Sequence, residues 1–266
     1  MPLSINTNIA SLTAQRSFLN SNSALETAFE RLSTGKRINS ASDDAAGLAI
    51  ATELNSRVSG LNQAVRNVND GLSMVQIMEG TYDEVTSILQ RMRDMAVQAA
   101  NGSLSSTEQG YLETEQTALQ SALTDALEQA TFGSTALITA EDTSGTALST
   151  SIGIQTGGSP GDRVSLTISS ASASNITALG ITAIDLDSAA TAAIGLADAA
   201  IGIVATQRAQ LGAYQSQLES TVRNLSNVAE NTAAAAGRIM DTDYAAETAN
   251  LTKAQILQQA ATSVLA

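Results

Sequence analysis

The feature that most constrains this chain is a seven-residue repeat of apolar side chains between Ser42 and Ala100. Its first row contains Leu54, Leu61, Val68, Val75, Tyr82 and Leu89, and a second row contains Val58, Val65 and Leu72, followed at a new offset by Met78, Val85 and Met92. A repeat sustained over about seven heptads is typical of a helix that buries one narrow seam against other helices. At about 1.5 Å per residue this helix would be roughly 90 Å long, so it needs partners of similar length.

A second long repeat supplies such a partner. It extends from Leu186 to about Ala236 and places apolar side chains seven residues apart at Val204, Leu211, Leu218 and Leu225. Arg208 and Gln215 fall on a companion row of this seam, where polar groups can fix the register of packing. A capping box of Ser105 and Glu108 predicts a third, shorter helix. The sequence therefore predicts a mostly α fold, in which long antiparallel helical rods form a coiled-coil bundle.

One segment, at about residues 147–169, has the alternation that is typical of strands. Apolar side chains there alternate with small polar ones on both sides of a turn. The turn contains Gly157, Gly158, Pro160 and Gly161, which are residue types that favour tight chain reversal. This pattern predicts one small β-hairpin within the helical fold.

Both chain ends carry weak amphipathic helices. The first stops at a glycine C-cap, Gly35, and the second follows a capping residue, Asp243. The predicted domains are a terminal coiled-coil domain of residues 1–41 and 237–266 and a helical rod domain of residues 42–236. We expect the two terminal helices to pack together through Ile9, Leu12, Phe18, Leu25, Phe29, Leu32, Ile256 and Leu257.

Polar residues at the expected helix ends are assigned to capping. Ser42 is predicted to accept hydrogen bonds from the first free amides of the long helix. Asn101-Gly102 is predicted to end that helix in a left-handed conformation. We also assign to capping, and not to metal binding, the acidic group of Asp241, Asp243 and Glu247, because the spacing lacks the further ligand and the glycine of a calcium loop.

Composition excludes several classes of function. The 266 residues include no cysteine and no histidine, which removes disulfides, thiol nucleophiles, imidazole bases and His-ligated metals, so we expect neither an enzyme nor a cofactor. The formal charge of −13 argues against nucleic acid, because phosphate binding needs clustered basic residues. Residues 189–205 are apolar, but Asp198 near their centre argues against membrane insertion.

Several blocks of the sequence together resemble bacterial flagellin. In the first half of the chain these blocks are Leu3 to Asn8, Arg31 to Asn39, Ser42 to Ile50 and Gln90 to Gln98. In the last part they are Arg208 to Ala213, Arg238 to Asp241 and Lys253 to Gln259. The resemblance covers about residues 1–132 and 186–266, and little sequence separates the hairpin from the second rod. The chain is thus similar to a flagellin reduced to its core, without outer domains.

The resemblance implies a structural subunit that polymerises with copies of itself into the flagellar filament and serves motility. It implies that the paired chain ends line the filament interior, with the rods and the hairpin in the next shell. It also implies export without a cleavable signal peptide to an extracellular location. The implied partners are an export chaperone at the C-terminal segment, the flagellar export apparatus, and hook-associated and cap proteins. We further expect the hairpin turn to absorb differences between subunits of a curved filament.

The resemblance extends to the segment sensed by the innate-immune Toll-like receptor for flagellin. Arg91 matches the key arginine of that segment, and Glu115 matches a supporting acid on the neighbouring helix. Met95 stands where the family usually has leucine. These three residues are therefore candidates for receptor recognition.

Two other functions remain open on the sequence alone. One is a flagellar hook–filament junction protein, which would share flagellin-like ends. The other is a secreted coiled-coil binding or adhesin module, which would be a stable monomer. Elongation of filament seeds by the purified chain separates flagellin from both.

Overall fold

The computed structural model describes residues 9–138, 150–158, 161–168 and 186–265. Its contacts divide the chain into two compact units, residues 1–59 with 228–266 and residues 60–227. We call the first the terminal unit and the second the rod unit. Both divisions fall inside long helices, α2 (Ala45–Ala99) and α5 (Leu186–Met240). The domain boundaries at residues 41/42 and 236/237 stay a prediction.

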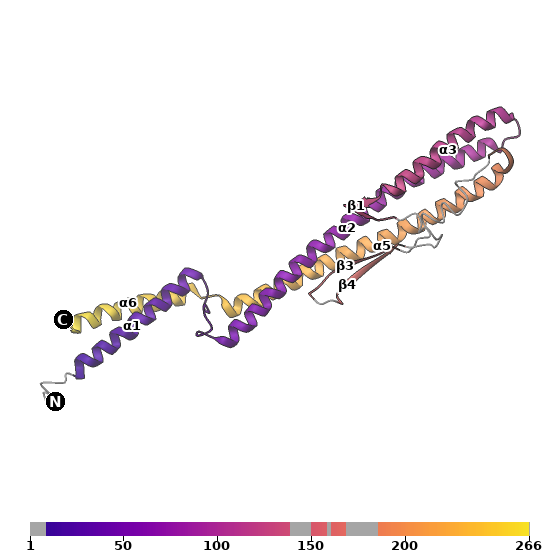
Figure 1. The fold of residues 1–266 in the computed structure, drawn as a ribbon. Helices are drawn as coiled ribbons and strands as arrows, with labels where there is room; N and C mark the ends of the chain where they lie inside the picture. Colours follow the sequence, from indigo (N-terminus) through magenta and orange to yellow (C-terminus); the bar gives the residue numbers. More distant parts are fainter. Residues whose placement is uncertain (1–8, 139–149, 159–160, 169–185, 266) are drawn as a thin grey trace. The chain divides into compact units, whose positions relative to one another are not determined.

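The rod unit is a bundle of α2, α3 (Ser106–Glu128) and α5 (Figure 1). The Ala99 carbonyl accepts a hydrogen bond from Gln109, and Arg91 contacts Glu115, so α3 turns back antiparallel to α2. Arg93 pairs with Asp198 and Asp83 pairs with Arg208, so α5 is antiparallel to α2 as well. Together with the hairpin described below, this arrangement confirms the predicted fold class.

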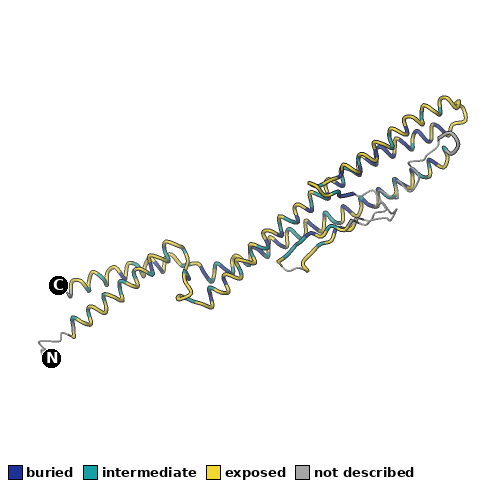
Figure 2. The backbone as a smooth tube through the Cα atoms, in the orientation of Figure 1, coloured by how far each residue is buried: buried dark blue, intermediate teal, exposed yellow. Residues whose placement is uncertain are grey.

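The heptad rows form the core of this unit. On the first row of α2, the side chains from Leu61 onward are buried, as is most of the matching row of α5: Leu61, Val68, Val75, Tyr82, Leu89, Val204, Leu211, Leu218 and Leu225. Val65 and Leu72 are half-buried, as are Leu54 and Val58 on the part of α2 that belongs to the terminal unit. Buried positions on α2 become denser from Met78 onward, where α3 lies alongside (Figures 1 and 2). The change of offset in the second row therefore coincides with the arrival of a third helix.

Two antiparallel hairpins accompany the helices. The predicted one is formed by β3 (Thr150–Gln155) and β4 (Arg163–Ile168), with Ile154 opposite Val164. A second, which sequence analysis missed, joins β1 (Thr131–Phe132) and β2 (Thr135–Ala136) through a turn that contains Gly133 at φ 62°. Two-residue strands are too short to show an alternation, so the sequence pattern suggested only a helix end there.

The terminal unit pairs α1 (Ile9–Thr34) with α6 (Tyr244–Leu265), as Figure 1 shows. Gly35 ends α1 at φ 71°, and its amide donates to the carbonyl of Arg31 at 2.8 Å, which confirms the predicted glycine cap. Asp243 begins α6, since its Oδ1 accepts hydrogen bonds from the amides of Ala245 and Ala246 at 2.9 and 3.2 Å. The capping role predicted for Asp243 is confirmed.

Two other cap predictions are wrong. Asp44, and not Ser42, caps α2: its Oδ1 accepts from the Gly47 amide at 2.9 Å. The preceding turn is held by Asp43, whose carboxylate accepts from the amides of Ser40 and Asn39 at 2.9 and 3.1 Å. At the other end of α2, Asn101-Gly102 is not left-handed, because among the described residues only Gly35 and Gly133 have positive φ.

Candidate functional site

The seam between α2 and α5 carries polar cross-links in the rod unit. Arg208 is 2.8 Å from Asp83, and the Gln215 amide donates to Glu79 at 3.3 Å. Nε of Arg93 is 2.6 Å from a carboxylate oxygen of Asp198. The two ion pairs are partly exposed and contribute about 1 kcal/mol or less each. Because each group meets one opposite position only, the contacts specify the register of the two rods.

The β3–β4 hairpin is attached to both rods. Ile154 packs where Gly71 of α2 has no side chain, a site in which any Cβ would overlap the isoleucine. The Asn67 amide donates to the Gln155 carbonyl at 3.2 Å. On α5, the Tyr214 hydroxyl accepts from the amide of Thr167 and donates to its carbonyl, both at 3.1 Å. The two strands are therefore held against α2 and α5.

The turn has one glycine with a steric requirement. A Cβ at Gly157 would lie 2.6 Å from the Cβ of Asp162, whereas Gly158 and Gly161 face open space. The Thr156 amide donates to the Asp162 carbonyl at 2.8 Å and narrows the turn further. Pro160, the remaining candidate, lies outside the described residues.

Two linkers cross in the terminal unit and form what we call the linker clasp, residues 35–37 and 239–242. The Arg37 amide donates to the Met240 carbonyl at 2.6 Å, and the Thr242 amide donates to the Gly35 carbonyl at 3.0 Å. The Arg37 guanidinium adds a hydrogen bond to the Ile239 carbonyl at 2.8 Å. The clasp therefore joins the segment that follows α1 to the segment that precedes α6.

Most residues predicted to pack the two terminal helices together remain accessible in the single chain. Ile9 is 71% exposed, Ile256 60% and Phe29 51%, and Leu12 and Leu257 are also exposed. Phe18, Leu25 and Leu32 are half-buried. Among the described residues, the buried apolar side chains of α1 and α6 are alanines that sequence analysis did not select, Ala28 at 1% and Ala254 at 5% exposure. One chain alone thus leaves an apolar surface on both terminal helices.

Glu247 is a buried acid that sequence analysis assigned only to helix capping. Its carboxylate is 4.0 Å from the Arg31 guanidinium, and a groove between α1 and α6 opens beside the pair. Among the described residues, no group of acids is arranged to hold a metal ion. Glu247 therefore acts as a contact between the terminal helices.

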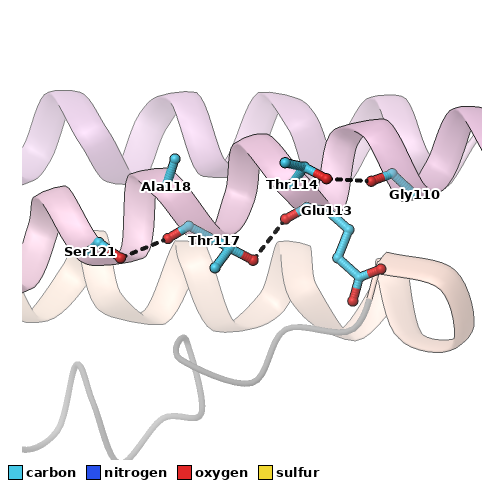
Figure 3. Close-up of a pocket in the computed structure, with 6 residues that line it drawn as sticks. All are labelled: Gly110, Glu113, Thr114, Thr117, Ala118 and Ser121. Atoms are coloured by element: carbon cyan, nitrogen blue, oxygen red, sulfur yellow. Dashed lines mark hydrogen bonds between the residues drawn. The ribbon is translucent and has the colours of Figure 1, made fainter.

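A shallow depression on α3 lacks the chemistry of an active site (Figure 3). The hydroxyls of Thr114, Thr117 and Ser121 each donate to the carbonyl four residues earlier in the helix, at 3.0, 2.9 and 3.1 Å. Glu113 extends from the same face into solvent. The hydroxyls are thus engaged with the helix backbone.

The receptor candidates lie near the paired ends of α2 and α3. Both Nε and a terminal nitrogen of Arg91 donate to the same oxygen of Glu115, at 3.0 and 2.6 Å. The two side chains are about half exposed. Met95 is 1% exposed and belongs to the core of the bundle. The surface feature of this region is therefore the arginine–glutamate pair.

One described helical segment, Ala190–Met240, is apolar and long enough to cross a membrane by length and composition. The core helix of a bundle passes the same test. Here the heptad row of α5, including Val204, Leu211 and Leu218, is buried within the rod unit.

These features define a class of protein: a helical structural subunit with an ordered rod and an apolar terminal surface. Residues 5–158 match the model of the bacterial flagellin N-terminal helical region, and residues 194–266 match that of the C-terminal helical region. The chain belongs to the flagellin family.

Individual relatives agree with this assignment. Flagellin A of Vibrio anguillarum is 34% identical, with coverage of 100% of this chain and 96% of the relative. The flagellar filament 33 kDa core protein of Treponema phagedenis is 37% identical, with coverage of 98% and 94%. The crystal structure of Bacillus cereus flagellin is 27% identical, with a TM-score of 0.50 over 64% of this chain and 94% of that one.

The comparisons establish a structural subunit of the flagellar filament and do not favour the junction protein or the adhesin. Homologous flagellins are structural proteins that polymerise into the extracellular filament. The alignment with the Vibrio anguillarum protein spans 365 positions against the 266 residues here, whereas that with the Treponema phagedenis protein spans 270. The chain thus has the length of a core flagellin.

Proposed function

We propose that this subunit assembles by burying, against neighbouring copies, the apolar surface that α1 and α6 leave exposed. The observation that carries the proposal is the high exposure of Ile9, Phe29 and Ile256 in the single chain. Burial of a large apolar side chain contributes about 1.5–3 kcal/mol. A head-to-tail contact that does not close on itself produces a helical polymer, so repeating this burial drives filament growth.

In this proposal the terminal segments and the rod segments of the chain occupy different shells of the filament. Residues 1–41 and 237–266 form the inner coiled coil of the filament, and residues 42–236 form the surrounding rods. The buried seam and polar cross-links support the role of the rods, because a preformed rod keeps its register while neighbours add. The linker clasp supports joint placement of the two terminal helices.

The test uses exposed residues, so that the monomer itself is spared. Phe29→Ser and Ile256→Ser should each reduce elongation of filament seeds, measured by sedimentation and light scattering. Tyr111→Ser is the matched control, because Tyr111 is as exposed as Ile9 but lies on α3 of the rod unit. Elongation by both terminal variants at the wild-type rate would contradict the proposal.

We propose that the hairpin turn changes conformation from one subunit to the next in a curved filament. Its attachment through Gly71, Asn67 and Tyr214 supports a turn that moves while the strands stay in place. Gly157→Ala should bring a Cβ against Asp162 and alter the filament waveform, whereas Gly158→Ala meets open space and serves as control. Identical waveforms in both variants, viewed by electron microscopy, would oppose this role.

We also propose export without a cleavable signal peptide, through the flagellar export apparatus, with a chaperone holding α6 beforehand. The absence of cysteine supports passage as an unfolded chain, since no disulfide can trap a folded state. The exposed Ile256 and Leu257 offer apolar contacts to a chaperone. Replacing both by serine should weaken chaperone binding in calorimetry of the full chain; unchanged affinity would exclude this site. Hook-associated and cap proteins remain proposed neighbours in the flagellum.

Recognition by the Toll-like receptor for flagellin is proposed for the Arg91–Glu115 pair. Its partial exposure supports direct contact, and donation from two nitrogens of Arg91 to one oxygen of Glu115 supports a fixed orientation. The monomeric Arg91→Ala variant should activate the receptor less strongly than the wild-type monomer when each is added to reporter cells that express the receptor. Arg66→Ala, an exposed arginine on the same helix, is the control. Equal activation by the two variants would remove Arg91 from the recognition surface.

A further inference from the structure

The loop that joins α2 to α3 contains the only Asn-Gly dipeptide in the chain, Asn101-Gly102. Both residues are exposed, and the loop is the reversal between the two helices in Figure 1. We propose that Asn101 is a site of spontaneous deamidation, which converts its side-chain amide into aspartate or isoaspartate without any enzyme. The proposal concerns the chemistry of this loop and does not depend on how the filament assembles.

The geometry places the reacting groups together. The Ser103 amide donates to Oδ1 of Asn101 at 3.4 Å, so the side chain folds back over the peptide bond of Gly102. This hydrogen bond also polarises the side-chain carbonyl and favours negative charge on its oxygen during attack. Among the described residues, none accepts a hydrogen bond from the Gly102 amide. Its nitrogen is therefore available as the nucleophile.

The reaction balances with water alone. The Gly102 nitrogen loses its proton to solvent and bonds to Cγ of Asn101, and the side-chain nitrogen leaves as ammonia, which gives a five-membered succinimide. Water then adds to one of the two ring carbonyls and a C–N bond breaks. Cleavage at Cγ leaves aspartate, and cleavage at the backbone carbonyl leaves isoaspartate with an extra main-chain methylene. The net change is one water consumed and one ammonia released, with no oxidation.

Elsewhere among the described residues, the two most similar positions lack this combination. Asp70-Gly71 has a glycine at the same place, but it lies inside α2 and Gly71 is buried against Ile154. Asn39-Ser40 lies in a linker, but the Ser40 amide is bound to the Asp43 carboxylate at 2.9 Å. Helical or bonded amides cannot reach the preceding side chain without local unfolding. Selectivity for Asn101 follows from the structure as well as from the dipeptide.

The product would disturb the end of α2. A neutral amide becomes a carboxylate just beyond the C-terminus of a helix, where the helix dipole disfavours negative charge. In the isoaspartate form, the added methylene also displaces the Leu104 amide from the Asn101 carbonyl, now 3.2 Å away. We expect faster hydrogen exchange in the last turn of α2 and the first turn of α3 after modification.

The test is incubation of the purified full-length chain at mildly alkaline pH, followed by peptide mass spectrometry and enzymatic isoaspartate detection. Deamidation should appear first at Asn101, and Asp70 should not isomerise to isoaspartate. Gly102→Ala is the matched variant, because a Cβ there meets no atom within 4 Å and φ is not positive. It should slow the reaction by about tenfold or more, which equals about 1.4 kcal/mol of added barrier. An unmodified Asn101, or faster reaction at Asn39 or in the helices, would overturn the inference.

Discussion

The rod unit and the terminal unit are both built from long helices, yet they bury their side chains differently. In the rod unit, Val75, Leu89 and Leu218 have essentially no exposed surface. In the terminal unit, the buried apolar side chains described on α1 and α6 are alanines, while larger side chains such as Phe29 and Ile256 face solvent. Helices therefore form a core of fully buried Val and Leu side chains in the rod unit, whereas α1 and α6 leave large apolar side chains exposed to solvent.

This difference indicates where stability and assembly reside. A buried Leu or Val stabilises the single chain, whereas an exposed one stabilises only a complex that covers it. In the assembly proposed above, the rod unit supplies the folded platform, and the terminal unit supplies the surface that neighbouring copies bury.

The largest difference between the two units is expected when one leucine in each is replaced by alanine and the loss of unfolding free energy is compared. Leu218→Ala in the rod unit should cost about 2–5 kcal/mol of unfolding free energy, because it leaves a cavity in a closed core. Leu25→Ala, at a half-buried position on α1, should cost about 1 kcal/mol in the monomer. Urea unfolding followed by circular dichroism measures both. Equal losses would mean that the terminal unit is as well packed as the rods.

A glycine pair tests how closely the hairpin packs within the rod unit. Gly71→Ala should destabilise the monomer by about 1–3 kcal/mol, because the new Cβ overlaps Ile154. Gly80→Ala, on the same helix but in open space, should stabilise it by about 0.5–1 kcal/mol through helix propensity. Thermal unfolding of the two variants gives the comparison. A Gly71→Ala protein as stable as wild type would show that the hairpin is not attached there.

The rod unit also contains one polar group whose replacement should strengthen it. Gln116 is 1% exposed, and neither its amide nitrogen nor its oxygen has a hydrogen-bond partner. Gln116→Leu should raise the unfolding free energy by about 1–3 kcal/mol, the range for an unsatisfied buried polar group. Gln120→Leu on the same helix is the control. Destabilisation by Gln116→Leu would indicate that the amide is satisfied in solution.

The smallest effects concern pH, and each unit offers one carboxylate. Hydrogen bonds from the Ser40 amide, then from the Asn39 amide, hold the pKa of Asp43 below its usual 3.8. The Ser105 amide and hydroxyl likewise hold the pKa of Glu108 below 4.5. A depressed folded pKa means that the stabilisation is complete above the ordinary value and is lost as pH falls through the folded one.

Asp43→Asn and Glu108→Gln should therefore each reduce the loss of unfolding free energy that accompanies acidification below pH 5. Near pH 7, neither substitution should change the slope of unfolding free energy against pH. Asp43 is expected to affect the melting of the α1–α2 turn, and Glu108 the start of α3. Urea titrations at several pH values measure the slope. A slope unchanged by either substitution would show that these hydrogen bonds do not persist in solution.

The heptad rows predicted the seam of the rod unit because Leu and Val at seven-residue spacing identify a buried face without ambiguity. The contacts of the terminal unit were missed for the opposite reason. Alanine is a good helix former on any face, so Ala28 and Ala254 carry no signal of burial in the sequence. Ile38 was also missed, since it stands alone in a polar linker and packs beside Gly47 at the start of α2 only once the linker has folded.

Cap predictions show a second limit. Ser42, Asp43 and Asp44 are adjacent residues that can all accept hydrogen bonds from free amides. Which residue caps the helix depends on the preceding turn. The Asp43 carboxylate accepts hydrogen bonds from the Asn39 and Ser40 amides in that turn, so Asp44 accepts the bond from the first turn of α2. The candidate pair Arg91 and Glu115 was suggested by family resemblance, and the structure brings the two side chains together.

The most direct test compares hydrogen exchange of the free subunit with that of the seeded filament. The account predicts that amides of α1 and α6 exchange rapidly in the monomer and become strongly protected in the polymer. Amides beside Leu89 and Leu218 should be protected in both states. Equal protection of α1 and α6 in monomer and filament, or continued rapid exchange in the filament, would contradict it.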